Sequence, residues 1–184
     1  MSSSWENVRV DGSNMRAYVS VPDDAKKVPA IVVVQGQTGV DDFIQFTRMV
    51  ASEGFVGAAP DLYHRDPPDC KDDAPTRRMR LTDRTLIADV NATVDYLKSH
   101  PAVDSARIGI VGFCMGGRAV YLMSAVNPDL KAGVMYYGGD PFMPGATVRR
   151  RLSAPKISIA RSWATSAKTI RIRRQRICAN STPR

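Results

Sequence analysis

The pentapeptide Gly-Phe-Cys-Met-Gly at residues 112–116 carries the clearest chemistry in this sequence. The β-branched run "RIGIV" precedes it, and the run "RAVYLMSAV", which favours a helix, follows it closely. Where a strand turns sharply into a helix, the central side chain of such a pentapeptide stands exposed at the carboxyl edge of the sheet. Glycine is favoured at Gly112 and Gly116 because a Cβ there would crowd the turn. The pattern therefore predicts that Cys114 is a thiol nucleophile on an elbow.

The surroundings expected for Cys114 suit attack on an acyl carbon. A helix N-terminus favours the thiolate over the thiol. The backbone N–H of Met115 is placed to donate to an oxyanion, and a second donor is expected near Gln37, in the loop after "VVVQG". The alternative is that Cys114 is a small buried residue beside a tight strand–helix connection and has no catalytic role. The strand before Cys114 and the helix after it favour the nucleophile.

Alternating strands and helices are expected to position this elbow. A hairpin is predicted around Asp11-Gly12, and residues 64–78 read as a polar, proline-rich loop. Continuous apolar runs indicate buried strands, and apolar residues at helical spacing indicate helices. The strands are expected within 28–36, 55–63, 106–113 and 131–139, and the helices within 41–54, 83–100 and 115–126. This order predicts an α/β fold with a mostly parallel sheet and flanking helices.

Five stretches of the chain resemble the dienelactone hydrolase (carboxymethylenebutenolidase-like) family of the α/β-hydrolase fold. They are "AIVVVQGQTGV", "EGFVGAAPDLYHR", "DVNATVDYL", "RIGIVGFCMGGRAV" and "AGVMYYGG". They follow the order and spacing of the family and cover about residues 5–140. The resemblance implies hydrolysis of lactones or activated carboxylic esters, with Cys114 as nucleophile and no metal or organic cofactor. Gln37 and Met115 match the family's oxyanion-hole positions.

The sequence departs from the family pattern at one position near the elbow. Some family members carry a glutamate where this chain has Gly36, in "QGQTG". The carboxylate that holds the resting cysteine in those members is therefore absent, which removes one means of activating the thiol.

The partners that a nucleophile of this kind needs are missing from the sequence after Cys114. The base and its orienting acid follow the nucleophile in this fold, in the order acid and then histidine. No histidine follows Cys114, and the only later acids are Asp129 and Asp140. His64 follows a strand end on the catalytic edge and is a candidate substitute, although a loop histidine is more often simply solvated. The same strand end makes Tyr63 a candidate pocket residue, or else a packed aromatic.

The last part of the chain differs sharply from the rest in charge. Residues 1–140 hold all 18 acidic residues and 15 of the 26 basic ones, whereas residues 141–184 hold 11 basic residues and no acid. No helical or strand periodicity follows Gly145. We therefore expect a partial α/β-hydrolase domain at 1–145, incomplete at its C-terminus, and a basic, disordered tail at 146–184. The edge of strand 131–139 is then expected to stay open and to invite aggregation.

Composition excludes several other classes of protein. The apolar share of 43% is that of an ordinary globular domain, and no apolar run approaches the ~20 residues of a membrane span. The N-terminus has no apolar signal core, so we expect a cytoplasmic protein without a membrane partner. The three cysteines and two histidines show no metal-ligand spacing and no disulfide framework.

Two functions from different classes follow from these observations. The first is a cysteine hydrolase of a small-molecule ester or lactone, impaired because the acid and the histidine of the triad are absent. The alternative is non-enzymatic binding of nucleic acid or another polyanion by the arginine-rich tail. Nucleic acid is the weaker hypothesis, because the tail has little aromatic interleaving and no basic helical face. Oligomeric state is left open.

A frameshift would explain the tail, and the encoding DNA tests this prediction. Back-translation of residues 145–170 permits another reading frame that contains acids and a histidine, which residues 146–184 lack. We expect one of the other two frames past the Pro144 codon to encode a strand, an aspartate, a helix and a histidine in that order. DNA sequencing around codon 145 checks this, and the absence of such a continuation from both frames would rule it out.

Overall fold

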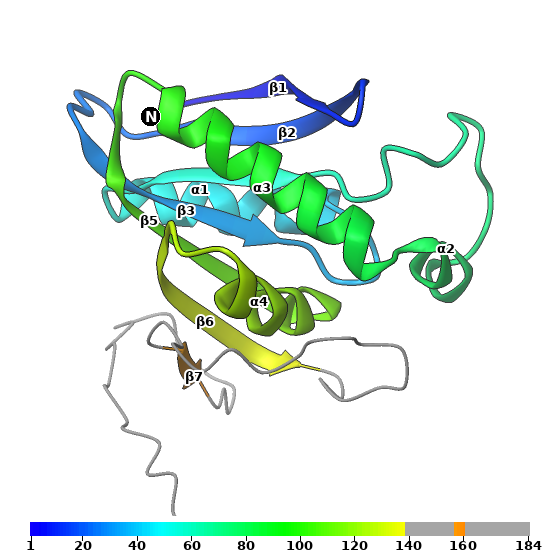
Figure 1. The fold of residues 1–184 in the computed structure, drawn as a ribbon. Helices are drawn as coiled ribbons and strands as arrows, with labels where there is room; N and C mark the ends of the chain where they lie inside the picture. The colour runs from blue at the N-terminus through cyan, green and yellow to red at the C-terminus, as the bar shows by residue number, and fades with distance from the viewer. Residues whose placement is uncertain (139–156, 161–184) are drawn as a thin grey trace, which may run out of the picture.

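A seven-stranded sheet forms the centre of the fold (Figure 1). The computed structural model describes residues 1–138 and 157–160. The strands lie in the order β1-β2-β4-β3-β5-β6-β7. Their bounds are β1 (Ser2–Val10), β2 (Ser13–Val21), β3 (Val28–Val34), β4 (Val56–Pro60), β5 (Val103–Cys114), β6 (Leu130–Gly138) and β7 (Ile157–Ala160).

Most of the sheet is parallel, as the sequence predicted. Strands β4, β3, β5, β6 and β7 pair in parallel, whereas β1 pairs antiparallel with β2, and β2 antiparallel with β4. The β1–β2 hairpin turns at Asp11 and Gly12, whose φ angles are 48° and 78°. Two successive left-handed residues match the right-handed twist of the flanking strands, which explains the Asp-Gly pair.

Helices cover both faces of the sheet. The helices are α1 (Ile44–Ser52), α2 (Ala74–Arg80), α3 (Asp83–Ser99) and α4 (Met115–Val126), with a 3-10 turn at Asp41–Phe43. Alternate residues of a strand point to opposite faces. Accordingly, Val32 packs in the core cluster that contains α3 and α4, and its neighbour Val33 packs in the cluster that contains Val50 of α1. None of the described helices is long and apolar enough to cross a membrane.

Two expectations about regular structure were wrong. Helix α2 lies partly inside the segment expected to be a loop, because Asp73 caps it by accepting a hydrogen bond from the Thr76 N–H at 2.9 Å. Strand β7 forms beyond Gly145, where no strand was expected, and pairs with Gly133–Tyr136 of β6. The edge of β6 is therefore covered over that length. The other residues of the expected disordered tail lie outside the described ones.

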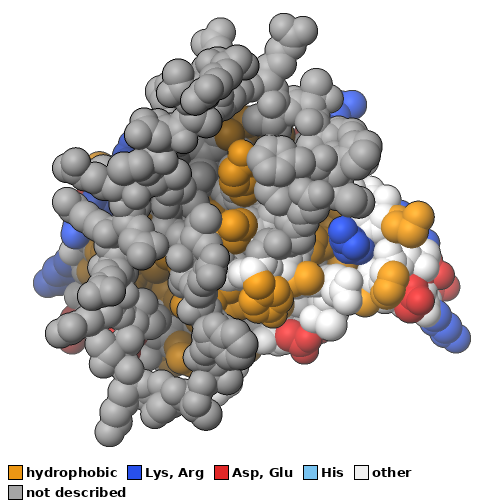
Figure 2. Space-filling model, turned by 90° about the horizontal axis from the view of Figure 1, so that it is seen from below, with side chains coloured by type: hydrophobic (Ala, Val, Ile, Leu, Met, Phe, Trp, Pro, Cys, Tyr) orange, Lys and Arg blue, Asp and Glu red, His pale blue; other side chains and the backbone are white. Residues whose placement is uncertain are grey.

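The β6 side of the molecule still exposes apolar surface. Figure 2 shows hydrophobic side chains gathered on the underside of the view in Figure 1, where β6 lies. Tyr137 on β6 is 68% exposed, and Val126 at the end of α4 is 44% exposed. Exposed apolar side chains beside a sheet edge favour self-association. We therefore still predict that the protein aggregates.

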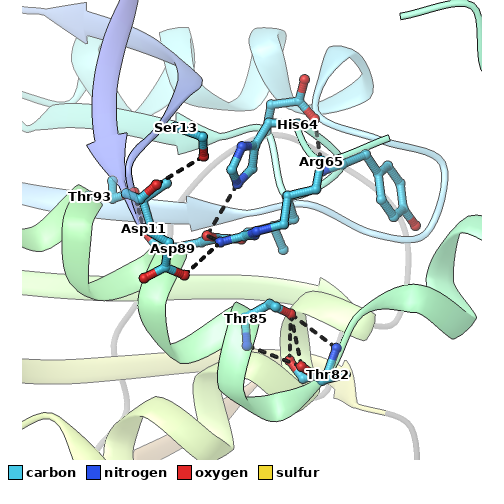
Figure 3. A network of polar contacts seen from close by, with 12 residues as sticks. Asp11, Ser13, His64, Arg65, Thr82, Thr85, Asp89 and Thr93 are labelled. Atoms are coloured by element: carbon cyan, nitrogen blue, oxygen red, sulfur yellow. Dashed lines mark hydrogen bonds and ion pairs between the residues drawn. The ribbon is translucent and has the colours of Figure 1, made fainter. Parts of the chain in front are cut away.

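A buried carboxylate joins the loop after β4 to α3 (Figure 3). Asp89 on α3 is fully buried and accepts two hydrogen bonds from the Arg65 guanidinium, both at 2.7 Å. His64 Nε2 lies 3.3 Å from Asp89 Oδ1, and Arg65 also reaches Asp11 in the β1–β2 turn at 3.2 Å. One carboxylate thus ties together the loop after β4, helix α3 and, through Arg65, the hairpin.

We expect Asp89→Ala to lower the free energy of unfolding by about 3 kcal/mol, because it leaves two polar partners without their acceptor. The matched control is Asp95→Ala, since Asp95 is an exposed aspartate on the same helix. Its effect should stay within about 0.5 kcal/mol. Urea unfolding followed by circular dichroism measures both. Equal losses in the two variants would contradict the role given to the Asp89 network.

Candidate active site

Cys114 occupies a strained turn between β5 and α4. Strand β5 ends at Cys114 and α4 begins at Met115. The backbone of Cys114 has φ 53° and ψ −115°, outside the usual regions for a residue with a Cβ. Such a conformation costs of order 1–3 kcal/mol and persists only where the surrounding structure imposes it. The Cys114 thiol is free and half-buried at the start of the helix.

The two glycines beside Cys114 allow three segments of backbone to approach closely. A Cβ on Gly112 would lie 2.1 Å from the Gly116 carbonyl oxygen. A Cβ on Gly116 would lie 2.3 Å from the Val34 carbonyl oxygen, at the end of β3. Both contacts are with backbone, which cannot move aside as a flexible side chain can. The first turn of α4 therefore packs directly against the end of β3, from which the Gln37 loop continues.

The structure brings Gln37, Met115 and Tyr63 together beside the elbow. The Tyr63 hydroxyl donates a hydrogen bond to the Gln37 carbonyl oxygen at 2.8 Å. The same hydroxyl lies 4.0 Å from the Met115 sulfur. Tyr63 and Met115 are buried, and Gln37 is half-buried. The loops after β3 and β4 and the first residue of α4 thus meet at one point, next to Cys114.

His64 lies in the Asp89 network rather than against the thiol. Its side chain is 3% exposed, and its Nε2 faces Asp89, as Figure 3 shows. Its Nδ1 has no hydrogen-bond partner among the described residues. No hydrogen bond or ion pair joins His64 to Cys114 in the described part of the chain. The suggestion that His64 replaces the missing base stays a prediction without a contact to support it.

Sequence reasoning did not single out Asp89 and Arg65, although the sequence held a signal for the first. The apolar stripe of α3 includes Leu86, Val90 and Val94, and Asp89 falls on the same face at helical spacing. An acid on a buried face requires a charged or hydrogen-bonding partner. The sequence could not identify that partner, because Arg65 lies 24 residues away on another element.

No other described feature forms a comparable site. The described residues contain no group of three or more His, Cys, Asp or Glu side chains that could hold a metal ion. A surface groove of about 480 Å³ runs between β1 and α3, and its lining residues do not include the elbow.

These observations define an α/β-hydrolase-type fold with a cysteine on the strained turn between β5 and α4. Residues 15–165 match the family model described as "Dienelactone hydrolase family". The match spans most of the chain, which therefore belongs to the dienelactone hydrolase family.

Curated relatives and a solved structure agree with this assignment. The chain is 35% identical over 135 residues to a protein of Yersinia pestis named "Putative carboxymethylenebutenolidase", covering 69% of this chain and 50% of that protein. A protein of the same name from Escherichia coli K12 is 36% identical over 143 residues, covering 74% of this chain and 52% of that protein. The chain thus spans about half the length of these relatives.

Among solved structures, the crystal structure titled as a "Putative Dienelactone Hydrolase" from Klebsiella pneumoniae aligns with a TM-score of 0.70 and 30% identity. The alignment covers 85% of this chain and 70% of that chain. The fold predicted from the five sequence stretches is therefore confirmed.

We expect Gly116→Ala to destabilise the protein by about 3 kcal/mol, because its Cβ meets the backbone of β3. Gly36→Ala is the matched control from the same site. Its Cβ would lie 3.5 Å from the Phe43 ring, an ordinary contact. Thermal unfolding followed by circular dichroism distinguishes the two variants. If Gly116→Ala were as stable as Gly36→Ala, the turn would have space for a Cβ at residue 116, which would contradict the close backbone contact described above.

Proposed function

We propose that Cys114 attacks the carbonyl carbon of a small lactone or activated carboxylic ester. The sulfur loses its proton to solvent and forms an S–C bond, and the carbonyl oxygen becomes an oxyanion. The backbone N–H groups of Gln37 and Met115 stabilise that oxyanion. Collapse of the intermediate breaks the ester C–O bond and releases an alcohol, or opens the lactone ring. Water then hydrolyses the thioester to give the acid and the free thiol.

The strained backbone of Cys114 carries this proposal. A cysteine that served only to fill space would not need φ 53° between two glycines packed against backbone. Strain of this kind concentrates at functional sites, where it points a side chain outward. The positions of Gln37 and Met115 beside the elbow, linked through Tyr63, support the proposal that their N–H groups are the two donors.

Turnover by this chain should be weak, because the sequence after Cys114 contains no histidine. One of the two later acids, Asp129, forms an ion pair with Lys98 at 2.7 Å on the surface. Loss of the base and acid from such systems removes several orders of magnitude in rate and leaves the contribution of the oxyanion hole. Attack on an activated ester, whose leaving group needs no protonation, is the step that should survive.

The alternative function, polyanion binding by the tail, gains no support. The names of the relatives described above refer to a lactone hydrolase and not to nucleic acid or lipid. The arginines on which this alternative depends lie outside the described residues.

A burst experiment with p-nitrophenyl acetate tests the proposal on the full chain. We expect release of about one equivalent of nitrophenolate per chain, an acetyl adduct on Cys114 by mass spectrometry, and slow turnover afterwards. Cys114→Ala should abolish the burst. The matched control is Cys70→Ala, which removes the other described free thiol and should keep the burst. A burst that survives in Cys114→Ala, or its absence from the unmodified chain, would contradict the proposal.

A further inference from the structure

Tyr63 connects the two residues proposed to hold the oxyanion. It follows β4, and it is 4% exposed. Its hydroxyl donates to the Gln37 carbonyl oxygen at 2.8 Å and lies 4.0 Å from the Met115 sulfur. A side chain from a third segment therefore touches both the loop after β3 and the start of α4.

The tyrosine ring is itself held in place. The Arg77 guanidinium of α2 lies 4.1 Å from the centre of the Tyr63 ring. Arg77 in turn donates to Asp66 at 2.7 Å. Burial raises the pKa of Tyr63, and the positive charge of Arg77 offsets only part of that rise. The hydroxyl accordingly keeps its proton near neutral pH and remains a donor.

The loop that carries Gln37 is mostly buried, but few backbone hydrogen bonds form within it. It contains a single isolated bridge between Gly36 and Gly39, in which the Gly39 N–H reaches the Gly36 carbonyl at 3.4 Å, near the limit for a hydrogen bond. Gly39 has a φ of 115°, a conformation that glycine adopts easily. The shorter bond from Tyr63 restrains the peptide between Gln37 and Thr38, which directly follows the Gln37 N–H in the chain.

We propose that Tyr63 is a positioning residue for acylation of Cys114. Its hydroxyl fixes the Gln37 carbonyl and thereby restricts the Gln37 backbone, whose N–H is the proposed oxyanion donor. Tyr63 makes no contact with the reacting atoms in this scheme. The inference rests on the proposed function of Cys114 and Gln37.

Two reactions of the Cys114 thiol distinguish a loss of oxyanion positioning from a general disturbance of the structure around the thiol. Acylation by p-nitrophenyl acetate passes through an oxyanion, whereas alkylation by iodoacetamide displaces iodide directly and forms none. Removal of an oxyanion donor lowers rates by about 100- to 1000-fold. A donor that is present but misaligned should lower the acylation rate by a smaller factor. We expect Tyr63→Phe to slow acylation about tenfold and to leave alkylation within about twofold.

Tyr96→Phe is the matched control, because it removes a hydroxyl from a half-buried tyrosine near the far end of α3. The other end of α3 is the one close to the elbow, because Asp83 there pairs with Arg118 of α4 at 2.7 Å. Tyr96→Phe should change neither rate. Arg77→Met is a second variant, which keeps the Tyr63 hydroxyl but removes the guanidinium over its ring. Arg77→Met should also slow acylation, but by a smaller factor than Tyr63→Phe. If Tyr63→Phe does not fold, the acylation rate of Arg77→Met tests the positioning role instead.

The outcomes distinguish this inference from the proposed function. If both rates fall together in the folded Tyr63→Phe protein, or if neither falls, the positioning role is wrong while acylation of Cys114 stands. If Tyr63→Phe does not fold, unchanged acylation in Arg77→Met likewise overturns the positioning role. If the unmodified chain is alkylated at Cys114 but not acylated, the proposed function fails, and the role of Tyr63 fails with it.

Discussion

The close packing of the first turn of α4 against the end of β3 is the constraint on which the site depends. Without a Cβ on Gly116, the helix backbone approaches the Val34 carbonyl, and Gly112 leaves room for the same turn. This approach forces Cys114 into its left-handed backbone conformation and holds the Gln37 loop beside the helix N-terminus. One backbone contact therefore brings together the strained turn at Cys114, the N-terminus of α4 and the proposed oxyanion donors.

The segment after β4 links this edge of the sheet to the helical layer. Tyr63 reaches toward the Gln37 loop and Met115, and its neighbours His64 and Arg65 reach toward the buried Asp89 of α3. Three consecutive side chains thus fasten one short loop on both sides. A loop held in this way can itself hold another loop, and the proposed positioning role of Tyr63 depends on that rigidity.

The groups proposed here to attack an acyl carbon and to stabilise its oxyanion all lie in the described part of the chain. The elbow, the helix N-terminus and the loop after β3 all belong to the first two thirds of the sequence. The acid and the histidine of the fold follow the nucleophile, and this sequence has no histidine there. Electrostatic stabilisation and proton transfer are separable contributions to the rate, which is why the proposed function keeps acylation by an activated ester and expects weak turnover.

Local patterns in the sequence were enough to predict the strands as far as β6, the main helices and the sharp turn at Cys114. The β-branched runs, the Asp11-Gly12 turn and the glycines around Cys114 are each read within a few residues, because steric fit and periodicity act locally. Helix α2 and strand β7 escaped prediction because their polar or irregular sequences gain stability from a cap and from pairing with β6. Only the tertiary structure could give Asp89 its partner Arg65 or place the Tyr63 hydroxyl on the Gln37 carbonyl. Those contacts join residues more than twenty positions apart, and their geometry depends on how whole elements pack.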